Sequence, residues 1–264
     1  MTELEFQFRT ELLFSEPVWD HVFSLHCLPR EDAAQQIQSY GITLEPAAGY
    51  ELRRDGFGSW LVCGSCLPPH RRFVYGSHGI VRVDHTREEP GENDPVFRYP
   101  TPLTLPDNAI RALWQTLPLA GKPPREQAEL LNRAAAEALA YCTGTTGVGT
   151  SAAEALKAGK GVCQDHTHLL LSLARLSGFA ARYCMGLIPG EGATHAWAEL
   201  ALPEGWQGFD PTNRREADET YLRFAVGRDA ADCLAEKGVF RGDPVQNMNI
   251  QMKLWKRERE SVKG

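Results

Sequence analysis

The apolar residues of this chain change their spacing twice along the sequence, and this change restricts the possible fold more than any other feature. Residues 4–83 contain short strand-like runs separated by the turn signals PAAG, RRDGFGS and LPPH. Residues 107–178 instead repeat apolar side chains at helical spacing, and strand-like runs return from residue 181 onward. Since strands and helices occupy separate blocks, the pattern predicts an α+β protein.

The predicted organisation has three parts. Residues 1–85 form a small antiparallel β-rich domain, since several short strands follow one another with turn signals between them. Residues 86–106, rich in proline and acidic side chains, are predicted to be a linker or a long wrapping loop. Residues 107–264 form a second domain. Within the first part, REDAAQQIQSY fits either a helical turn or a connecting strand.

Start and stop signals locate four helices in the second domain. Asp107 is a predicted cap for DNAIRALWQTL, and prolines precede the helical run PREQAELLNRAAAEALAY. Ser151 and Glu154 match a capping box, with Gly159 just past the helix end. The fourth helix ends at the stop signal Gly178. Its apolar face is marked by Leu169, Leu170, Leu173 and Leu176.

Three strand-like runs follow the fourth helix and predict an antiparallel meander. They are ARYCMGLI, THAWAELAL and WQGFDPTN, joined by the turns PGEG and PEG. The runs YLRFAVGR and MNIQMKLW predict later strands. Neighbouring antiparallel strands joined by a short turn place their ends side by side. We therefore expect the beginning of the second run to lie near the end of the third.

Cys163 lies in GKGVCQDHTHLL, at the predicted start of the fourth helix. A cysteine there is either a small buried hydrophobe or an activated nucleophile, because a helix N-terminus and a neighbouring imidazole both stabilise a thiolate. His195 begins the second strand of the meander and Asp210 ends the third. Taken singly, His195 also fits a strand residue and Asp210 a turn residue. Their joint placement with Cys163 predicts a nucleophile, a base and an orienting acid.

The segments GKGVCQDHTHLLLSLARLSGFAARYCMG, THAWAEL and GWQGFDPTN together resemble the bacterial transglutaminase-like superfamily of papain-like thiol enzymes. FSEPVWDHVFSLHCLP and DGFGSW are similar to the N-terminal β domain of many bacterial members, and RFAVGRDAADC and GVFRGDP to the segment after the DPTN motif. The resemblance therefore covers nearly the whole chain. It implies a papain-like core, in which the nucleophile helix packs on an antiparallel sheet, as the catalytic domain at 107–264.

The resemblance also implies roles for single residues. Cys163 is the nucleophile, His195 the base and later the acid, and Asp210 the residue that orients the imidazole. The implied chemistry is attack on an amide or ester carbonyl, a thioester intermediate, and acyl transfer to water or an amine. The backbone N–H of Cys163 is the first candidate oxyanion donor and Gln164 the second. Trp197 is a candidate substrate contact, with core packing as the alternative.

The implied function is that of a thiol enzyme acting on a peptide or protein amide without a cofactor. A peptidase or amidase is favoured over a crosslinking enzyme, because no residue of the sequence identifies a water-excluding amine acceptor site; an acyltransferase stays open. The alternative from another class is a non-catalytic protein- or peptide-binding module on the same fold. The natural substrate and the oligomeric state are not predicted.

Two patterns raise the possibility of a metal site. Asp165, His166 and His168 are close in sequence, but the two histidines are two apart on a helix and do not share a face. Structural support of the helix is the favoured role of His168. Cys63 and Cys66 form a C-x-x-C without a second pair or a βαβ context, so a strand-and-turn pair is favoured over a zinc or redox site. No metal site is predicted.

Composition excludes several partners. The 264 residues carry a net charge of −6, from 28 basic and 34 acidic side chains, which predicts neither nucleic acid nor an anionic membrane as a partner. No apolar run approaches the roughly 18 residues of a membrane span, and the N-terminus lacks a signal pattern. Seven cysteines fit free thiols in a reducing compartment. We therefore predict a cytoplasmic protein.

Overall fold

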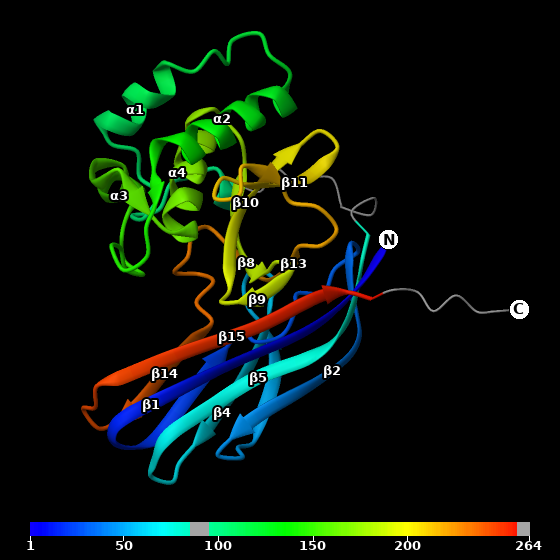
Figure 1. Cartoon of the computed structure of the whole chain (residues 1–264), viewed down its shortest axis with the longest axis vertical. Coiled ribbons are helices and arrows are strands. Elements are labelled where there is room, and N and C mark those ends of the chain that lie inside the picture. Colours follow the sequence, from blue (N-terminus) through cyan, green and yellow to red (C-terminus); the bar gives the residue numbers. More distant parts are fainter. Residues whose placement is uncertain (85–94, 258–264) are drawn as a thin grey trace, which may run out of the picture.

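A computed structural model describes residues 1–84 and 95–257 of the chain. One half consists of long antiparallel strands, and the other is a smaller sheet covered by helices (Figure 1). The predicted α+β class, with an N-terminal β region, is confirmed. The strands of the first half are β1 (Thr2–Leu25), β2 (Gln35–Glu45), β3 (Tyr50–Arg54), β4 (Trp60–Cys66), β5 (His70–Val83), β14 (Glu236–Arg241) and β15 (Gln246–Lys256).

Strand β1 runs through the whole first half and pairs with four partners. Its beginning lies between β5 and β15, and its end lies between β4 and β14. The pairing with β5 skips from Leu13 to Val18, and Asp20 has a φ of 51°, so the strand bends between the two sets of partners. Before the bend, every second side chain is buried, as the alternation of LEFQF indicates.

The second half contains four helices and a five-stranded antiparallel sheet with the order β12-β11-β10-β8-β13. The helices are α1 (Asn108–Gln115), α2 (Pro124–Ala138), α3 (Ala152–Ala158) and α4 (Cys163–Leu176). The strands are β8 (Ala181–Leu187), β10 (His195–Leu202), β11 (Gly205–Asp210), β12 (Arg215–Glu216) and β13 (Leu222–Gly227). The predicted meander corresponds to β8, β10 and β11. Among the described residues, no helix combines the length and apolar character needed to cross a membrane.

Helix α1 begins, and helix α3 begins and ends, where their predicted capping residues lie, whereas α2 ends at Ala138, before the end of the predicted run at Tyr141. Asp107 accepts a hydrogen bond from the N–H of Ile110 at 2.9 Å, which caps α1. Ser151 and Glu154 form the predicted capping box of α3, and Gly159 ends that helix in the left-handed conformation, with a φ of 66°. These contacts are local in sequence, which explains why the sequence alone located them.

Helix α4 is the central helix of the second half and packs on the sheet through buried leucines. Strand β10 presents small and aliphatic residues to this core, including Ala196 and Ala198, while Trp197 belongs to a separate cluster on the other face. This separation follows from the alternation of side chains along a strand. The fully buried leucines of α4 are Leu169, Leu170, Leu171 and Leu173.

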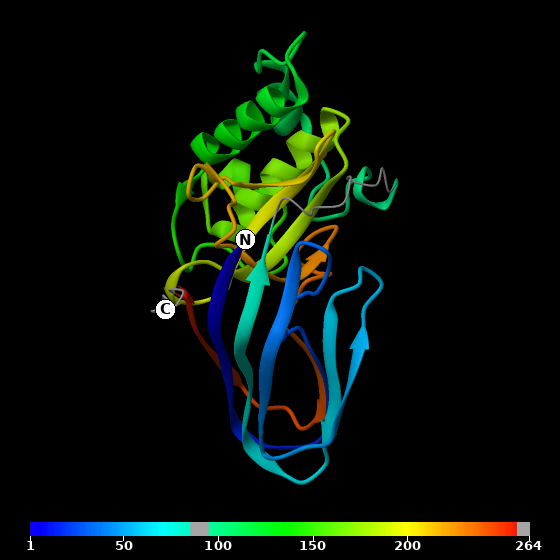
Figure 2. The same ribbon diagram turned by 90° about the vertical axis from the view of Figure 1, so that its right-hand side faces the viewer.

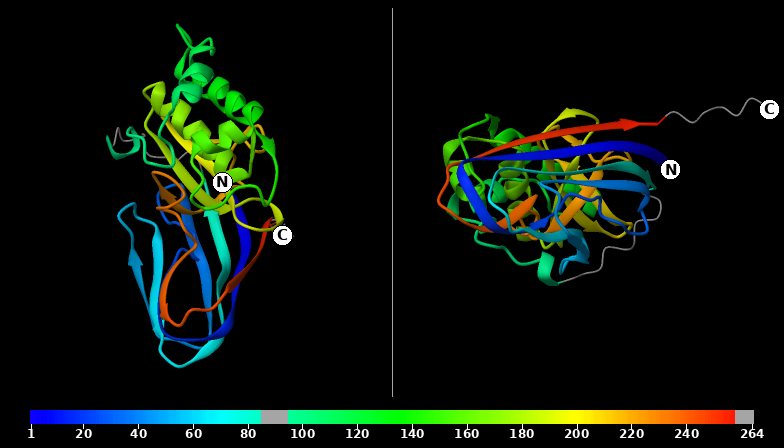
Figure 3. Two further views of the ribbon diagram at one scale, coloured as in Figure 1. Left: turned by 90° about the vertical axis from the view of Figure 1, so that its left-hand side faces the viewer. Right: turned by 90° about the horizontal axis from the view of Figure 1, so that it is seen from below.

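The end of the chain returns to the first half. Strands β14 and β15 both pair with β1, and Figures 2 and 3 show β15 running beside β1. Strand β9 (Gly190–Gly192), within the PGEG turn, pairs with β15. The sequence-based limits placed all of 107–264 in one domain, but the pairing of β14 and β15 joins them to the sheet of the N-terminal region. Pairing between strands so far apart in sequence leaves no local signal.

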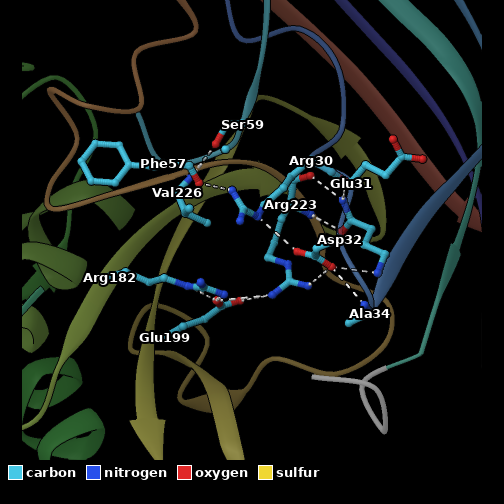
Figure 4. Close-up of polar contacts among 12 residues, drawn as sticks. Arg30, Glu31, Asp32, Ala34, Phe57, Ser59, Arg182, Glu199, Arg223 and Val226 are labelled. Atoms are coloured by element: carbon cyan, nitrogen blue, oxygen red, sulfur yellow. Dashed lines mark hydrogen bonds and ion pairs between the residues drawn. The ribbon is translucent and has the colours of Figure 1, made fainter. Parts of the chain in front are cut away.

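The two halves also meet through a buried network of ion pairs (Figure 4). Glu199 of β10 lies 2.5 Å from Arg182 of β8 and 3.2 Å from Arg223 of β13. Arg223 in turn lies 3.3 Å from Asp32, which precedes β2, and Asp32 pairs with Arg30 at 3.1 Å. The network therefore connects the small sheet of the second half to the segment between β1 and β2.

Part of the predicted linker is held against α4. Residues 86–94 lie outside the described residues, whereas 95–106 can be followed and include the short helix η2 (Pro95–Phe97). The buried guanidinium of Arg175 donates hydrogen bonds to the carbonyl of Phe97 at 3.1 Å and to the hydroxyl of Thr104 at 2.7 Å. The described part of this segment therefore wraps around the core.

Candidate active site

Cys163 is the first residue of α4 and its side chain is partly buried. The preceding N–H, of Val162, donates to the carboxylate of Asp165 at 2.7 Å, and Thr146 donates to the same carboxylate at 2.6 Å. Gly161 is required before this turn, because a Cβ there would lie 2.5 Å from the Cβ of Asp165. The sequence GVCQD thus forms a tight entry into the helix and places the side chain of Cys163 at the helix N-terminus.

His195 and Asp210 come from neighbouring strands and form a direct hydrogen bond. Nε2 of His195 lies 2.7 Å from Oδ2 of Asp210, whose side chain is fully buried. Strand β10 pairs with β11 antiparallel, with Ala198 opposite Phe209, so the start of one strand lies beside the end of the other. Because Nε2 faces Asp210, Nδ1 is the nitrogen that remains for Cys163.

The charges around His195 make it basic. Burial lowers the pKa of the imidazole, but hydrogen bonds to Asp210 and Cys163 and the charges of both groups raise this pKa to about 9. Burial likewise raises the pKa of Asp210, but the hydrogen bonds and charge of its neighbours, first of all His195, hold this pKa below its usual value. At neutral pH the geometry therefore favours an imidazolium between a carboxylate and the sulfur of Cys163.

Two further residues hold the carboxylate of Asp210. The hydroxyl of Tyr221 and the side-chain amide of Asn213 each donate to Oδ2 at 2.7 Å, and the backbone N–H of Asn213 donates to Oδ1 at 3.1 Å. Arg215 donates to the oxygen of Tyr221 at 2.8 Å. Asn213 lies in the DPTN motif, three residues after Asp210, and that spacing is the one signal by which sequence reasoning could have found it. Tyr221 had none.

Comparisons with known proteins agree with this geometry. A family model described as the transglutaminase-like superfamily matches residues 111–211, and one described as the bacterial transglutaminase-like N-terminal region matches residues 4–82. An uncharacterized protein of Mycobacterium leprae is 33% identical over 271 residues, which cover 93% of this chain and 95% of the relative. The chain belongs to the transglutaminase-like superfamily.

A second sequence relative and a solved structure also resemble this transglutaminase-like chain. An uncharacterized protein of Mycobacterium bovis is 28% identical over 267 residues, covering 88% of this chain and 85% of the relative. A crystal structure from Cytophaga hutchinsonii, described as a candidate cysteine protease, has a TM-score of 0.79 at 18% identity and covers 98% of this chain and 93% of its own. At this identity the likeness shows a shared fold. The family and fold expected from the sequence are both confirmed.

Trp197 of the transglutaminase-like core does not line an open groove. Its indole is 1% exposed and lies between the rings of His195, at 6.4 Å, and Tyr221, at 5.2 Å. Gly186 leaves room for this indole, since a Cβ there would come within 2.7 Å of it. The substrate contact predicted for Trp197 therefore has no accessible surface in the structure, and the alternative role of core packing fits its position.

The two candidate oxyanion donors, the side-chain amide of Gln164 and the backbone N–H of Cys163, differ in whether they already have a hydrogen-bond acceptor in the protein. The side-chain amide of Gln164 donates to the carbonyls of Gly147 and Val148, both at 3.3 Å, so this group already has acceptors within the protein. The backbone N–H of Cys163 belongs to the first turn of α4, where amide groups have no acceptor inside the helix. Of the two, the backbone group is the one free to bind a developing negative charge.

The residues considered for a metal site point to separate partners. The ring of His166 lies between the carbonyls of Val162, at 3.0 Å, and Leu139, at 3.1 Å. His168 instead accepts a hydrogen bond from the N–H of Ala230 at 3.2 Å. Within residues 1–84 and 95–257, no three His, Cys, Asp or Glu side chains converge as metal ligands would.

Cys63 and Cys66 do not face one another. Both lie on β4, where an odd spacing places side chains on opposite faces of the strand. Cys63 lies 3.7 Å from the hydroxyl of Ser24, whereas Cys66 is buried beside His70, at 3.6 Å. All seven cysteines of the chain are free thiols.

Proposed function

We propose that the protein is a thiol enzyme that cleaves or transfers acyl groups at amide bonds, as a peptidase or amidase or as a protein-glutamine acyltransferase. The observation that carries the proposal is the position of His195, which hydrogen-bonds Asp210 at 2.7 Å and also interacts with Cys163. A base between a thiol and a buried carboxylate is the arrangement that thiol acyl transfer requires.

The proposed reaction begins with the thiolate of Cys163, whose proton resides on His195. The sulfur attacks the carbonyl carbon, and the carbonyl electron pair moves to oxygen, where the backbone N–H of Cys163 donates a hydrogen bond. His195 then gives its proton to the leaving amine, and a thioester remains on the sulfur. Asp210 keeps the imidazole oriented and stabilises its charge. Water or an amine, deprotonated by His195, then attacks the thioester carbonyl. The C–S bond breaks, the acid or the new amide is released, and the thiolate of Cys163 is restored beside the protonated His195.

We favour hydrolysis of a peptide or protein amide over crosslinking. The sequence identifies no amine acceptor site that excludes water, and Cys163 is only partly buried. The description of the Cytophaga hutchinsonii structure as a candidate cysteine protease points in the same direction. We also retain a cytoplasmic location as a proposal, because the chain carries seven free thiols.

The proposal is tested by alkylation with iodoacetamide between pH 5 and 9, with each modified cysteine identified by mass spectrometry. We expect Cys163 to react first near neutral pH, and His195→Ala to slow this reaction by roughly tenfold or more. The exposed His78 provides the control His78→Ala, which should leave the rate unchanged.

The second candidate function is a non-catalytic binding module on the same fold. If Cys163 reacts no faster than the other cysteines in a folded protein, and His195→Ala changes nothing, the thiolate–imidazolium pair does not exist. That result would reject the enzyme and favour the binding module. A preferential reaction of Cys163 would instead justify a screen of peptide amides for the substrate.

A further inference from the structure

A pocket of about 590 Å³ lies between three segments that are far apart in sequence. They are part of the wrapping segment, at residues 96 and 99–103, the loop residues 148–149 before α3, and residues within 228–234, which follow β13. Sites for small ligands usually have volumes of about 300–1,000 Å³, so this pocket has a suitable size. None of its lining residues belongs to the group formed by Cys163, His195 and Asp210.

Hydrogen bonds from α3 and α4 hold the walls of this pocket together. The buried guanidinium of Arg175 in α4 donates to the carbonyl of Phe97 at 3.1 Å and to the carbonyl of Arg228 at 2.6 Å. The N–H of Ala152, the first residue of α3, donates to the carbonyl of Leu103 at 2.8 Å. The pocket is therefore preformed, and a ligand does not have to order its walls.

The lining of the pocket combines apolar surface with charges that already have partners. Among the described residues, its charged side chains are Arg228, Asp229 and Asp232. Arg228 donates to both carboxylate oxygens of Asp232, at 2.8 and 3.0 Å. The buried Asp229 accepts a hydrogen bond from the N–H of Ala231 at 2.8 Å. Because an unpaired charge is costly to bury, the pocket fits an uncharged apolar group. Its apolar residues include Val96, Tyr99, Pro102, Leu103, Val148 and Leu234.

One wall of the pocket is connected to the turn that carries the nucleophile. Gln164 follows Cys163 in sequence, and its side-chain amide binds the carbonyls of Gly147 and Val148. Val148 and Gly149 line the pocket, and Val148 is 71% exposed. A single side chain therefore links the backbone beside the thiol to the pocket wall. A few residues of an extended peptide, at about 3.3 Å each, cover such a span.

We propose that this pocket, named here the Val148 pocket, holds an apolar side chain of the peptide whose amide carbonyl Cys163 attacks. The inference rests on the proposed function and names its substrate class, a peptide with a large apolar residue near the scissile bond. Burial of that side chain binds the peptide and helps to place its carbonyl at the thiol. The bonds that form and break remain those of the proposed reaction.

Three maleimides that differ in the group on their nitrogen test the pocket on the full chain. A thiolate adds to the C=C bond of a maleimide, and the neighbouring carbon takes a proton from solvent. N-Ethylmaleimide has a short chain, N-hexylmaleimide has a long one, and 6-maleimidohexanoic acid has a long chain that ends in a carboxylate. The rate at which each modifies Cys163 is measured by mass spectrometry, with Cys163→Ala as the background.

We expect N-hexylmaleimide to modify Cys163 at least about tenfold faster than N-ethylmaleimide, since each buried methylene group contributes a factor of about four. 6-Maleimidohexanoic acid should lack this advantage, because burial of its carboxylate is costly and Arg228 is already paired with Asp232. The rate with N-hexylmaleimide divided by the rate with N-ethylmaleimide, the chain-length ratio, is therefore the measured quantity.

Two variants at exposed positions alter different walls of the Val148 pocket. Val148→Asp adds a carboxylate to one wall, and Ala231→Phe fills the space from another. Both should lower the chain-length ratio to near one, whereas their iodoacetamide rates at Cys163 should stay within about twofold of wild type. The matched control is Val239→Asp, at an exposed valine of β14 outside the pocket, which should keep the wild-type ratio.

The outcomes separate this inference from the proposed function. A wild-type chain-length ratio near one, while Cys163 still reacts first with iodoacetamide, overturns the pocket and leaves the proposed function intact. A high ratio that persists in Val148→Asp or Ala231→Phe places the apolar group elsewhere, and slower iodoacetamide labelling in both variants means that these positions act on the thiol. Either result overturns the inference. If wild-type Cys163 reacts with iodoacetamide no faster than the other cysteines, the proposed function fails, and the inference with it.

Discussion

Tyr221 donates its hydroxyl hydrogen to Oδ2 of Asp210 over 2.7 Å, although Asp210 ends β11 and Tyr221 lies just before β13. The same oxygen accepts a hydrogen bond from His195. A carboxylate that is fully buried needs several donors to stay charged, because water no longer solvates it. The basicity of His195 therefore depends on residues that do not touch the thiol.

Replacement of Tyr221 by phenylalanine should expose this dependence. Tyr221→Phe removes one donor from a buried carboxylate and leaves Arg215 without the hydroxyl that it contacts at 2.8 Å. We expect the free energy of unfolding to fall by about 2 kcal/mol, as for hydrogen bonds to charged groups. Urea unfolding measures the change, and Tyr40→Phe serves as the exposed control. A loss as small as that of the control would contradict the role given to Tyr221.

The raised pKa of His195 predicts a loss of stability at alkaline pH. The imidazole has a pKa of about 9 in the folded chain against 6.5 as its ordinary value, so the stabilisation is complete below pH 6.5 and disappears as the pH rises through 9. It amounts to at most about 3 kcal/mol. We expect the difference in unfolding free energy between wild type and His195→Gln to shrink over this range. A difference that stays constant from pH 6 to 9.5 would sink the prediction.

His168 predicts the opposite dependence at acid pH. Its burial lowers the pKa of the imidazole to about 4, against an ordinary value of 6.5. The neutral ring accepts a hydrogen bond from the N–H of Ala230, so stability is complete above pH 6.5 and is lost as the pH falls toward 4. The loss is about 3 kcal/mol. In His168→Gln the unfolding free energy should fall less between pH 6.5 and 4 than in wild type, whereas the control His78→Gln should lose as much as wild type. If the unfolding free energies of both variants fall equally over this range, the role assigned to His168 is wrong.

Glu199 is the central acid of the network between the two halves. Glu199→Gln leaves Arg182 and Arg223 without the buried carboxylate that they share. We expect a loss of about 3–5 kcal/mol in unfolding free energy, as when one partner of a buried ion pair is removed. The matched control is Glu216→Gln, which breaks an exposed pair with Arg125 and should cost less than about 1 kcal/mol. Similar losses of unfolding free energy in the two variants would show that the buried network stabilises the fold no more than the exposed ion pair does.

Much of the local structure could be predicted because its signals are local. The caps at Asp107 and Ser151, the leucine spacing of α4 and the short turns of the meander each depend on residues within a few positions of one another. The relation of His195 to Asp210 could be expected for the same reason, since a short turn joins their two strands. The family resemblance followed from the three motifs that these elements carry.

The sequence by itself determined the class of fold, the family, and the helix start that carries Cys163. Only the tertiary structure decided that β15 pairs with β1 across nearly the whole chain, that Trp197 is buried, and that Tyr221 reaches Asp210. The physical reason is the range of the interactions. Periodicity, caps and turns act between neighbours in sequence, whereas strand partners, burial and the donors of a buried carboxylate are chosen among surfaces that meet only once the chain has folded.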